Sequence, residues 1–168
     1  MMRLSIADLI VRPKTIAAKI RGDGDDPVHA RLDLALDSDT PGRFQAFVRV
    51  KRVLKENFSI GLRYLDDDGG DAILIRVNGD HGGHRNPDGG VILSGPHVHG
   101  FRGPTLELPP RNRAEPRWAW PIAPDHLALP MAWRTFCDLA NVRSERKFER
   151  EVAKLYTSSR QLSFKAFR

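Results

Sequence analysis

Cysteine is almost absent from this sequence, since Cys137 is its single thiol in 168 residues. One cysteine excludes an internal disulfide and a thiolate cluster around a structural zinc ion. Long apolar runs are absent as well: none approaches the roughly 20 residues of a membrane-spanning helix, so no membrane partner is expected. The first residues lack a small-residue cleavage site and place Asp8 inside their apolar stretch, unlike a signal peptide. These absences predict a cytoplasmic protein.

Apolar and polar residues alternate in three segments with a period of two, which is the pattern of a half-buried β-strand. Short connections that contain glycine, proline or aspartate join these segments and predict tight turns. Consecutive strands joined by tight turns form an antiparallel β-meander. A further short strand is expected at residues 96–101. The three alternating segments are residues 29–37, 44–51 and 58–65, and the mostly apolar segment 72–77 is expected to form a fourth strand.

Helices are expected near both ends of the chain. Ser5 can cap a short helix that Pro13 ends, and residues 14–20 can continue it for one or two turns. Near the other end, residues 127–142 carry apolar side chains along one helical stripe. These segments predict the fold class α+β: an antiparallel β-meander sheet packed by N-terminal and C-terminal helices.

The segment 102–124 separates the strands from the C-terminal helices. Its prolines and arginines argue against regular secondary structure. Trp118 and Trp120 are expected to anchor the segment on the core, because aromatic side chains contribute large apolar areas when they are buried.

Basic residues gather at the C-terminal end, although the whole chain has a formal net charge of only +6. Residues 143–168 hold eight Lys and Arg against three Glu, and Arg146, Arg150 and Lys154 recur at every fourth position. On a helix this spacing makes one cationic stripe, which attracts nucleic acid, attracts an acidic protein such as an antitoxin, or stays solvated. We expect residues 1–142 to form a single α+β domain, with 143–168 packed on it as a basic helix and tail.

Four of the six histidines fall within nineteen residues, in a segment rich in glycine. On a strand, His97 and His99 project from the same face, because side chains repeat every two residues. His81 and His84 lie in a loop whose glycines give the backbone extra freedom, and such a loop can reach back over its own sheet. Clustered titratable groups are markers of functional sites, so this segment is the predicted site.

One interpretation of the cluster is metal-free cleavage of RNA. Histidine suits both the general base that activates a 2′-hydroxyl and the general acid that protonates the leaving oxygen, because its pKa is near neutrality. His84, His97 and His99 are the candidate acid and base. Arg76 and Arg85 are the candidates to stabilise the charge on the phosphorane. This interpretation needs no cofactor.

Two other interpretations stay open. A His-x-His pair on a strand, with further ligands from a distant loop, is a normal coordination set for zinc or another transition metal. Alternatively, the histidines are structural and only hydrogen-bond the backbone of a turn-rich loop. Under the metal interpretation the ligands are His97 and His99 with one or two of His81, His84, Asp80 and Asp88.

The order of several short motifs resembles a family of small, uncharacterised bacterial and phage proteins. The resemblance covers residues 44–142 and implies a site at the histidines without implying an activity. More distantly, the run Arg…His…Pro-His-x-His is similar to TumE-type toxins of toxin–antitoxin modules, relatives of RelE-like ribonucleases, which implies an endoribonuclease. The motifs, in chain order, are Asn57-Phe-Ser, Arg76-Val-Asn-Gly-Asp-His81, His84-Arg-Asn86 and His97-Val-His99.

These observations together predict a small cytoplasmic RNA-acting protein, a toxin-like endoribonuclease that uses the paired histidines. The basic C-terminal helix would then be an accessory RNA contact. The alternative from another class is a phage- or mobile-element-encoded binding protein that inhibits a host or defence complex through its cationic face. A metal-dependent hydrolase that uses the same histidines is the third possibility, and metal analysis separates it from the metal-free nuclease.

Overall fold

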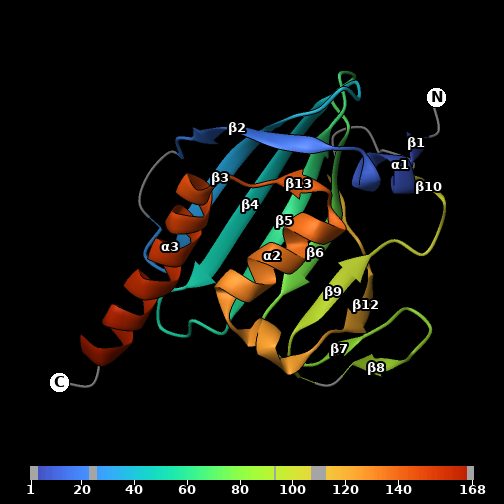
Figure 1. Ribbon diagram of the computed structural model, residues 1–168. Coiled ribbons are helices and arrows are strands. Elements are labelled where there is room, and N and C mark those ends of the chain that lie inside the picture. Colours follow the sequence, from blue (N-terminus) through green and yellow to red (C-terminus); the bar gives the residue numbers. More distant parts are fainter. Residues whose placement is uncertain (1–3, 23–25, 93, 107–112, 166–168) are drawn as a thin grey trace.

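The chain forms an α+β structure around one large, mostly antiparallel sheet (Figure 1). The computed structural model describes residues 4–22, 26–92, 94–106 and 113–165. Over these residues the sheet has nine strands, eight of which follow one path. In spatial order they are β12 (Trp118–Pro121), β9 (His97–Gly100), β6 (Asp71–Asn78), β5 (Phe58–Leu65), β4 (Arg43–Lys51), β3 (His29–Asp37), β2 (Lys14–Ile20) and β13 (Val142–Arg143), while β11 (Arg113–Ala114) pairs with β6.

The strands from β2 to β6 each pair antiparallel with the next strand in the sequence. Beyond β6 the sheet continues antiparallel through β9 to β12, whereas β13 and β11 join in parallel. Strands β3 to β6 occupy the three alternating segments and the apolar segment 72–77, so these four strand predictions are confirmed. Burial alternates residue by residue along β4, because one face of the sheet meets the core and the other is polar.

Residues 14–20 form strand β2, so the predicted continuation of the N-terminal helix over them is wrong. Pro13 has no backbone N–H to continue the preceding helix, and the chain beyond it pairs with β3. Lys14 holds the junction, because its buried ammonium donates hydrogen bonds to the carbonyl oxygens of Ile10 and Ala140 at 2.9 and 3.2 Å. Long-range pairing therefore decides the conformation here, as is common for strands.

The segment 102–124 contains short strands, so the expectation of no regular structure there is wrong; its residues 107–112 lie outside the described part. β12 extends the large sheet, and β10 (Thr105–Leu106) pairs with β1 (Leu4–Ser5). In β12 the small residue Ala119 is buried, whereas Trp118 is half-buried and Trp120 is 43% exposed. Strand pairing, not burial of the two tryptophans, attaches this segment to the core.

Helices α2 (Leu129–Leu139) and α3 (Arg146–Lys165) lie across one face of the sheet (Figure 1). Buried side chains of both helices join buried strand residues in one hydrophobic cluster, among them Trp133, Phe136, Phe148 and Val152. Burial of one such side chain contributes about 1.5–3 kcal/mol. The short helix α1 (Ile6–Val11) begins at the predicted cap, and η1 (Pro124–Leu127) precedes α2.

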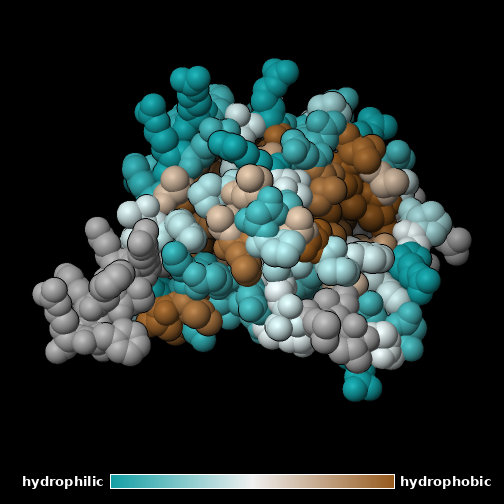
Figure 2. Space-filling view, turned by 60° about the horizontal axis from the view of Figure 1, so that its bottom comes forward, coloured by the Kyte–Doolittle hydropathy of each residue, from teal (hydrophilic) through white to brown (hydrophobic). Residues whose placement is uncertain are grey.

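The surface seen in Figure 2 is largely hydrophilic around its rim, with apolar residues gathered between the polar ones. Among the described residues, no helix combines the length and the hydropathy needed to cross a membrane.

Candidate metal centre

Two of the four histidines lie on β9, on the sheet face opposite to α2 and α3. Val77 of β6 and Val98 of β9 pair with each other and pack against the core. Side chains alternate along a strand, so the residues on either side of these valines project from the other face. His97 and His99 therefore share a face, as predicted, and both are buried. In the antiparallel pairing of β6 with β9, Asn78 is opposite His97, and Arg76 is opposite His99.

The other two histidines come from the loop between β6 and β9, which contains the hairpin of β7 (His84–Arg85) and β8 (Val91–Ile92). Asp80 closes the base of this loop, because its carboxylate accepts the backbone N–H groups of Gly82 at 3.4 Å and Gly95 at 3.2 Å. Gly82 has a φ of 102°, a conformation that glycine adopts without steric cost.

Asn86 attaches the loop to the outer edge of the sheet. Its side-chain amide accepts the N–H of Ala119 at 2.9 Å and donates to the carbonyl oxygen of Ala119 at 3.1 Å. Ala119 is the β12 residue paired with His99 on β9. The amide thus satisfies the free edge of β12 and holds His84 beside His99, with ring centroids 4.8 Å apart.

The four histidines converge on one point, and we call them the histidine cluster. One ring nitrogen from each lies within 4.8 Å of the others. The rings meet edge to face, with centroid separations from 4.5 to 5.0 Å. The loop histidines are more exposed than the strand histidines, so the centre is closed toward the sheet and open toward the loop. Its members are His81, His84, His97 and His99.

Hydrogen bonding prepares His97 to act as a ligand. Its Nδ1 lies 2.8 Å from the carbonyl oxygen of Gly95 and therefore carries the proton, which leaves a lone pair on Nε2. That lone pair accepts the amide N–H of Asn78 at 3.3 Å, a hydrogen bond that a coordinated ion would replace, and the Asn78 oxygen accepts the hydroxyl of Ser59 at 2.8 Å. Metal-binding histidines are commonly oriented through the second ring nitrogen in this way.

His99 has no such partners: within the described part of the chain, neither of its buried ring nitrogens makes a hydrogen bond. The Nε2 of His84 is likewise buried without a partner there. Buried polar atoms are nearly always satisfied in folded proteins. One nitrogen of His99 and the Nε2 of His84 would gain a partner if the cluster bound a cation, because each imidazole offers one ligand atom.

Burial also keeps these imidazoles uncharged. It lowers the pKa of His97 to about 4 and that of His99 to about 3, where the positive charge of Arg76 adds to the effect. The pKa values of His81 and His84 are lowered as well, chiefly by burial. Neutral imidazole is the form that binds metals, so the cluster is in its ligating form at neutral pH.

Arg76 is the cation nearest in the sheet to the cluster, since it is paired with His99. Its side chain is only 24% exposed and forms a long ion pair of 3.9 Å with the half-exposed Glu115. Its Nε is buried without a hydrogen-bond partner among the described residues. Arg85, predicted alongside it, is exposed on β7.

The two carboxylates considered as ligands lie outside the histidine cluster. Asp80 is engaged with the loop backbone. Asp88 is exposed and forms a 3.8 Å ion pair with Arg102. The potential ligand set found among the described residues is therefore made of imidazoles alone.

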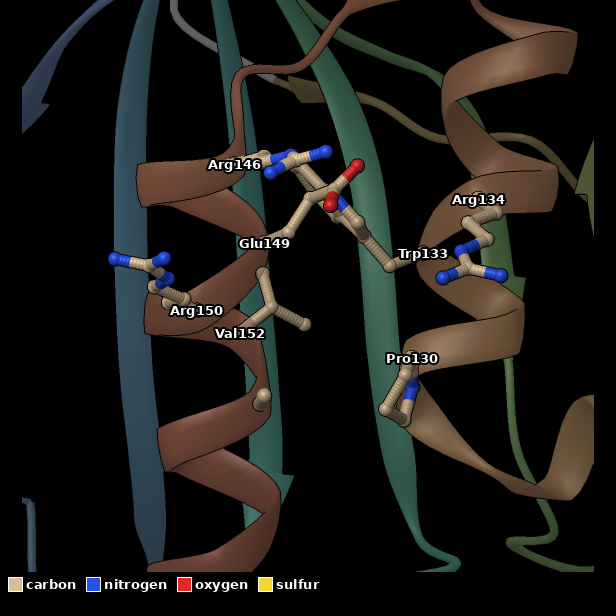
Figure 3. A pocket seen from close by; sticks show the side chains of 8 residues that line it. Pro130, Trp133, Arg134, Arg146, Glu149, Arg150 and Val152 are labelled. Carbon is tan, nitrogen blue, oxygen red and sulfur yellow. The ribbon is translucent and has the colours of Figure 1, made fainter.

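The predicted cationic stripe lies on the helical side of the molecule. Arg146 and Arg150 line a groove of about 300 Å³ between α2 and α3, together with Arg134 of α2 (Figure 3). Lys154 forms an ion pair with Glu151 at 2.7 Å. Because α2 and α3 cover the opposite sheet face, the structure does not bring this stripe to the histidines.

Sequence reasoning missed the residues that position the cluster. Asn86 and Asn78 appear in the quoted motifs, as the last residue of His84-Arg-Asn86 and inside Arg76-Val-Asn-Gly-Asp-His81. The sequence alone indicates no role for them, because Asn86 binds the backbone of Ala119, which is 33 residues away. The presence of both asparagines in these motifs was the sequence feature that could have pointed to their role.

One comparison with known proteins gives a match. A model of a protein family of unknown function, DUF6978, matches residues 4–142. The matched range contains the whole histidine cluster and ends before α3. No curated protein and no solved structure matches the chain.

Proposed function

Because the chain belongs to this family of unknown function, we propose a function from the geometry of its own residues: the histidine cluster binds a transition-metal ion such as zinc. We further propose that the centre serves a metal-dependent hydrolase. The observation that carries the proposal is the convergence of four imidazole nitrogens within 4.8 Å. The unpartnered nitrogens of His99 and His84 support it, since coordination would satisfy one nitrogen of each residue.

The metal-free nuclease fits the geometry less well. General acid–base cleavage needs one protonated and one neutral group at the working pH. His97 and His99 have pKa values of about 4 and 3, so both are neutral near pH 7. They are also 0% and 5% exposed, which keeps them from direct contact with an RNA hydroxyl. We keep RNA as the proposed substrate and propose that a metal ion, rather than a histidine acid–base pair, assists its hydrolysis.

The composition of the site favours particular metals. Imidazole ligands suit zinc, copper, nickel and iron, whereas magnesium and calcium prefer oxygen ligands. When bound, such an ion supplies a Lewis acid and lowers the pKa of a coordinated water. His97 and His99 would provide the fixed side of the centre, because they lie on β9, which is paired with a strand on each side. The more exposed His81 leaves the loop side as the approach for substrate.

Metal analysis of protein purified without chelator tests the proposal. We expect elemental analysis by inductively coupled plasma mass spectrometry to find one transition-metal ion per wild-type chain. The double variant His97→Ala, His99→Ala should lose the ion. His126→Ala is the matched control, because His126 hydrogen-bonds Thr135 rather than the cluster.

A thermal unfolding curve for each variant separates loss of the ion from loss of the fold. Wild-type protein that takes up no zinc, copper, nickel or iron at millimolar concentration would overturn the proposal. Equal metal content in the double variant and in wild type would do the same.

A further inference from the structure

A cavity of about 400 Å³ opens directly beside the histidine cluster. It is lined by His81 and Asn78 at the cluster and by Arg76 next to it. Arg49 and Ser59 form part of the remaining wall. Pockets for small ligands have volumes of about 300–1,000 Å³, so this one has the size of a small-ligand pocket.

The two arginines in this wall differ in what already binds them. Arg49 forms an ion pair with Asp33 at 2.6 Å and donates to the carbonyl oxygens of Leu32 and Val48. Arg76 has only its 3.9 Å ion pair with Glu115, and its Nε is buried without a hydrogen-bond partner among the described residues. The guanidinium of Arg76 therefore has donors to spare on the cavity side.

Charge balance points to the sign of the ligand. Four neutral imidazoles leave the charge of a divalent ion uncompensated, because the cluster contains no carboxylate. Arg76 adds a further positive charge, and it is close enough to lower the pKa of every histidine in the cluster. Buried charge without a counter-charge is costly. A metal-loaded site would thus favour an anion in the adjoining cavity.

We propose that this cavity binds a phosphate group, held between the metal ion on its histidine side and the Arg76 guanidinium on its wall. The proposal rests on the metal site proposed above. A guanidinium presents paired N–H donors that match two phosphate oxygens. The cavity of about 400 Å³ is larger than one phosphate, so a terminal phosphate monoester and one diester of an RNA backbone both fit in it.

Calorimetric titration of zinc-loaded protein with inorganic phosphate tests the inference. Binding should weaken at least tenfold in the zinc-free protein and at least tenfold in Arg76→Gln. Arg43→Gln is the matched control, because Arg43 is an exposed arginine on β4 that does not line the cavity. Its phosphate affinity should equal that of wild type.

Zinc content and thermal unfolding are measured on the same samples, so that failure of the metal site can be distinguished from failure of the phosphate site. If wild type binds zinc and Arg76→Gln binds both zinc and phosphate as wild type does, the phosphate site is wrong and the metal site stands. If wild type binds no zinc, both proposals are wrong. Should Arg76→Gln unfold, Arg76→Lys keeps the charge and loses the paired donors, and an unchanged phosphate affinity in it would overturn the inference.

Two further ligands distinguish the source of the phosphate. A nucleoside 5′-monophosphate carries a monoester, and a dinucleotide without terminal phosphate carries only a diester. Tighter binding of either one supports the phosphate site and identifies its source. Failure of both to compete with inorganic phosphate would overturn the cavity as a substrate site.

Discussion

Asn86 determines where the loop of His81 and His84 lies, although it is not itself a candidate ligand. Its two hydrogen bonds to Ala119 take the place of a neighbouring strand at the edge of β12. Each such bond contributes about 1 kcal/mol. The residue that pairs with Ala119 on the other side is His99, so one amide sets the distance between the loop and the strand histidines.

Replacing Asn86 should therefore weaken metal binding without removing a ligand. For Asn86→Ala we expect zinc affinity to fall about 10- to 100-fold, the usual range for loss of a supporting hydrogen bond around a metal site. Competition with a chromophoric chelator measures the change. Gln45→Ala, on β4, is the control and should bind zinc as wild type does. An unchanged affinity in Asn86→Ala would show that the loop is held by other contacts.

Among the elements, β5, β6 and β11 are joined by one carboxylate. Asp71 of β6 accepts two hydrogen bonds from Arg63 of β5, at 2.9 and 2.6 Å. It also accepts one from Arg113 of β11, at 2.8 Å. The arginines hold the pKa of Asp71 below its ordinary 3.8, with the Arg63 hydrogen bonds as the main cause. The ionised carboxylate is thus favoured by folding.

This network predicts a pH-dependent contribution to stability. Since the folded pKa of Asp71 is depressed, its contribution is present above the unfolded value of 3.8 and is lost as the pH falls through the folded pKa. At pH 7, Asp71→Asn should lower the free energy of unfolding by about 2 kcal/mol. Urea unfolding should show this difference shrinking below pH 4. Asp68→Asn, in an exposed turn, should show neither effect.

Period-two alternation identified strands β3 to β5, because each has one face in the core, whereas β6 was identified as a short apolar run that is buried over four consecutive residues. Neither pattern identified β2 or β12, whose strand state depends on partners distant in sequence: β12 pairs with β9 through Ala119 and His99. The common face of His97 and His99 followed from strand geometry alone. Their meeting with the loop histidines required the Asn86 attachment, which no local pattern encodes.

On the scale of the whole molecule, two candidate binding regions lie on opposite faces of the sheet. One is the histidine cluster with Arg76, and the other is the groove of Arg134, Arg146 and Arg150 between α2 and α3 (Figure 3). A ligand on one face does not contact the other. Binding of RNA to the helices and metal binding at the cluster should therefore vary independently.

Charge reversal on α3 tests this independence. If the stripe contacts RNA, Arg146→Glu with Arg150→Glu should weaken RNA binding and reduce its salt dependence by about one unit of slope for each lost phosphate contact. Fluorescence anisotropy with a labelled RNA at several salt concentrations measures both quantities, and zinc content should not change. Lys147→Glu is the control, because Lys147 is on the same helix and pairs with Glu145. Equal affinity and salt slope in wild type and the double variant would exclude the stripe as an RNA contact and favour a protein partner.

The loop that carries His81 and His84 meets strand β9 at the histidine cluster. A metal ion bound there would link the loop to the strand much as a disulfide bond would. A chain with one cysteine has no internal disulfide to restrain a long surface loop. An ion shared by His81, His84, His97 and His99 would cross-link residues up to eighteen positions apart, and so act as a staple. Metal binding would restrain this loop as well as supply the ion for the proposed reaction. The metal-free chain would differ from the metal-bound one mainly in the mobility of this one loop.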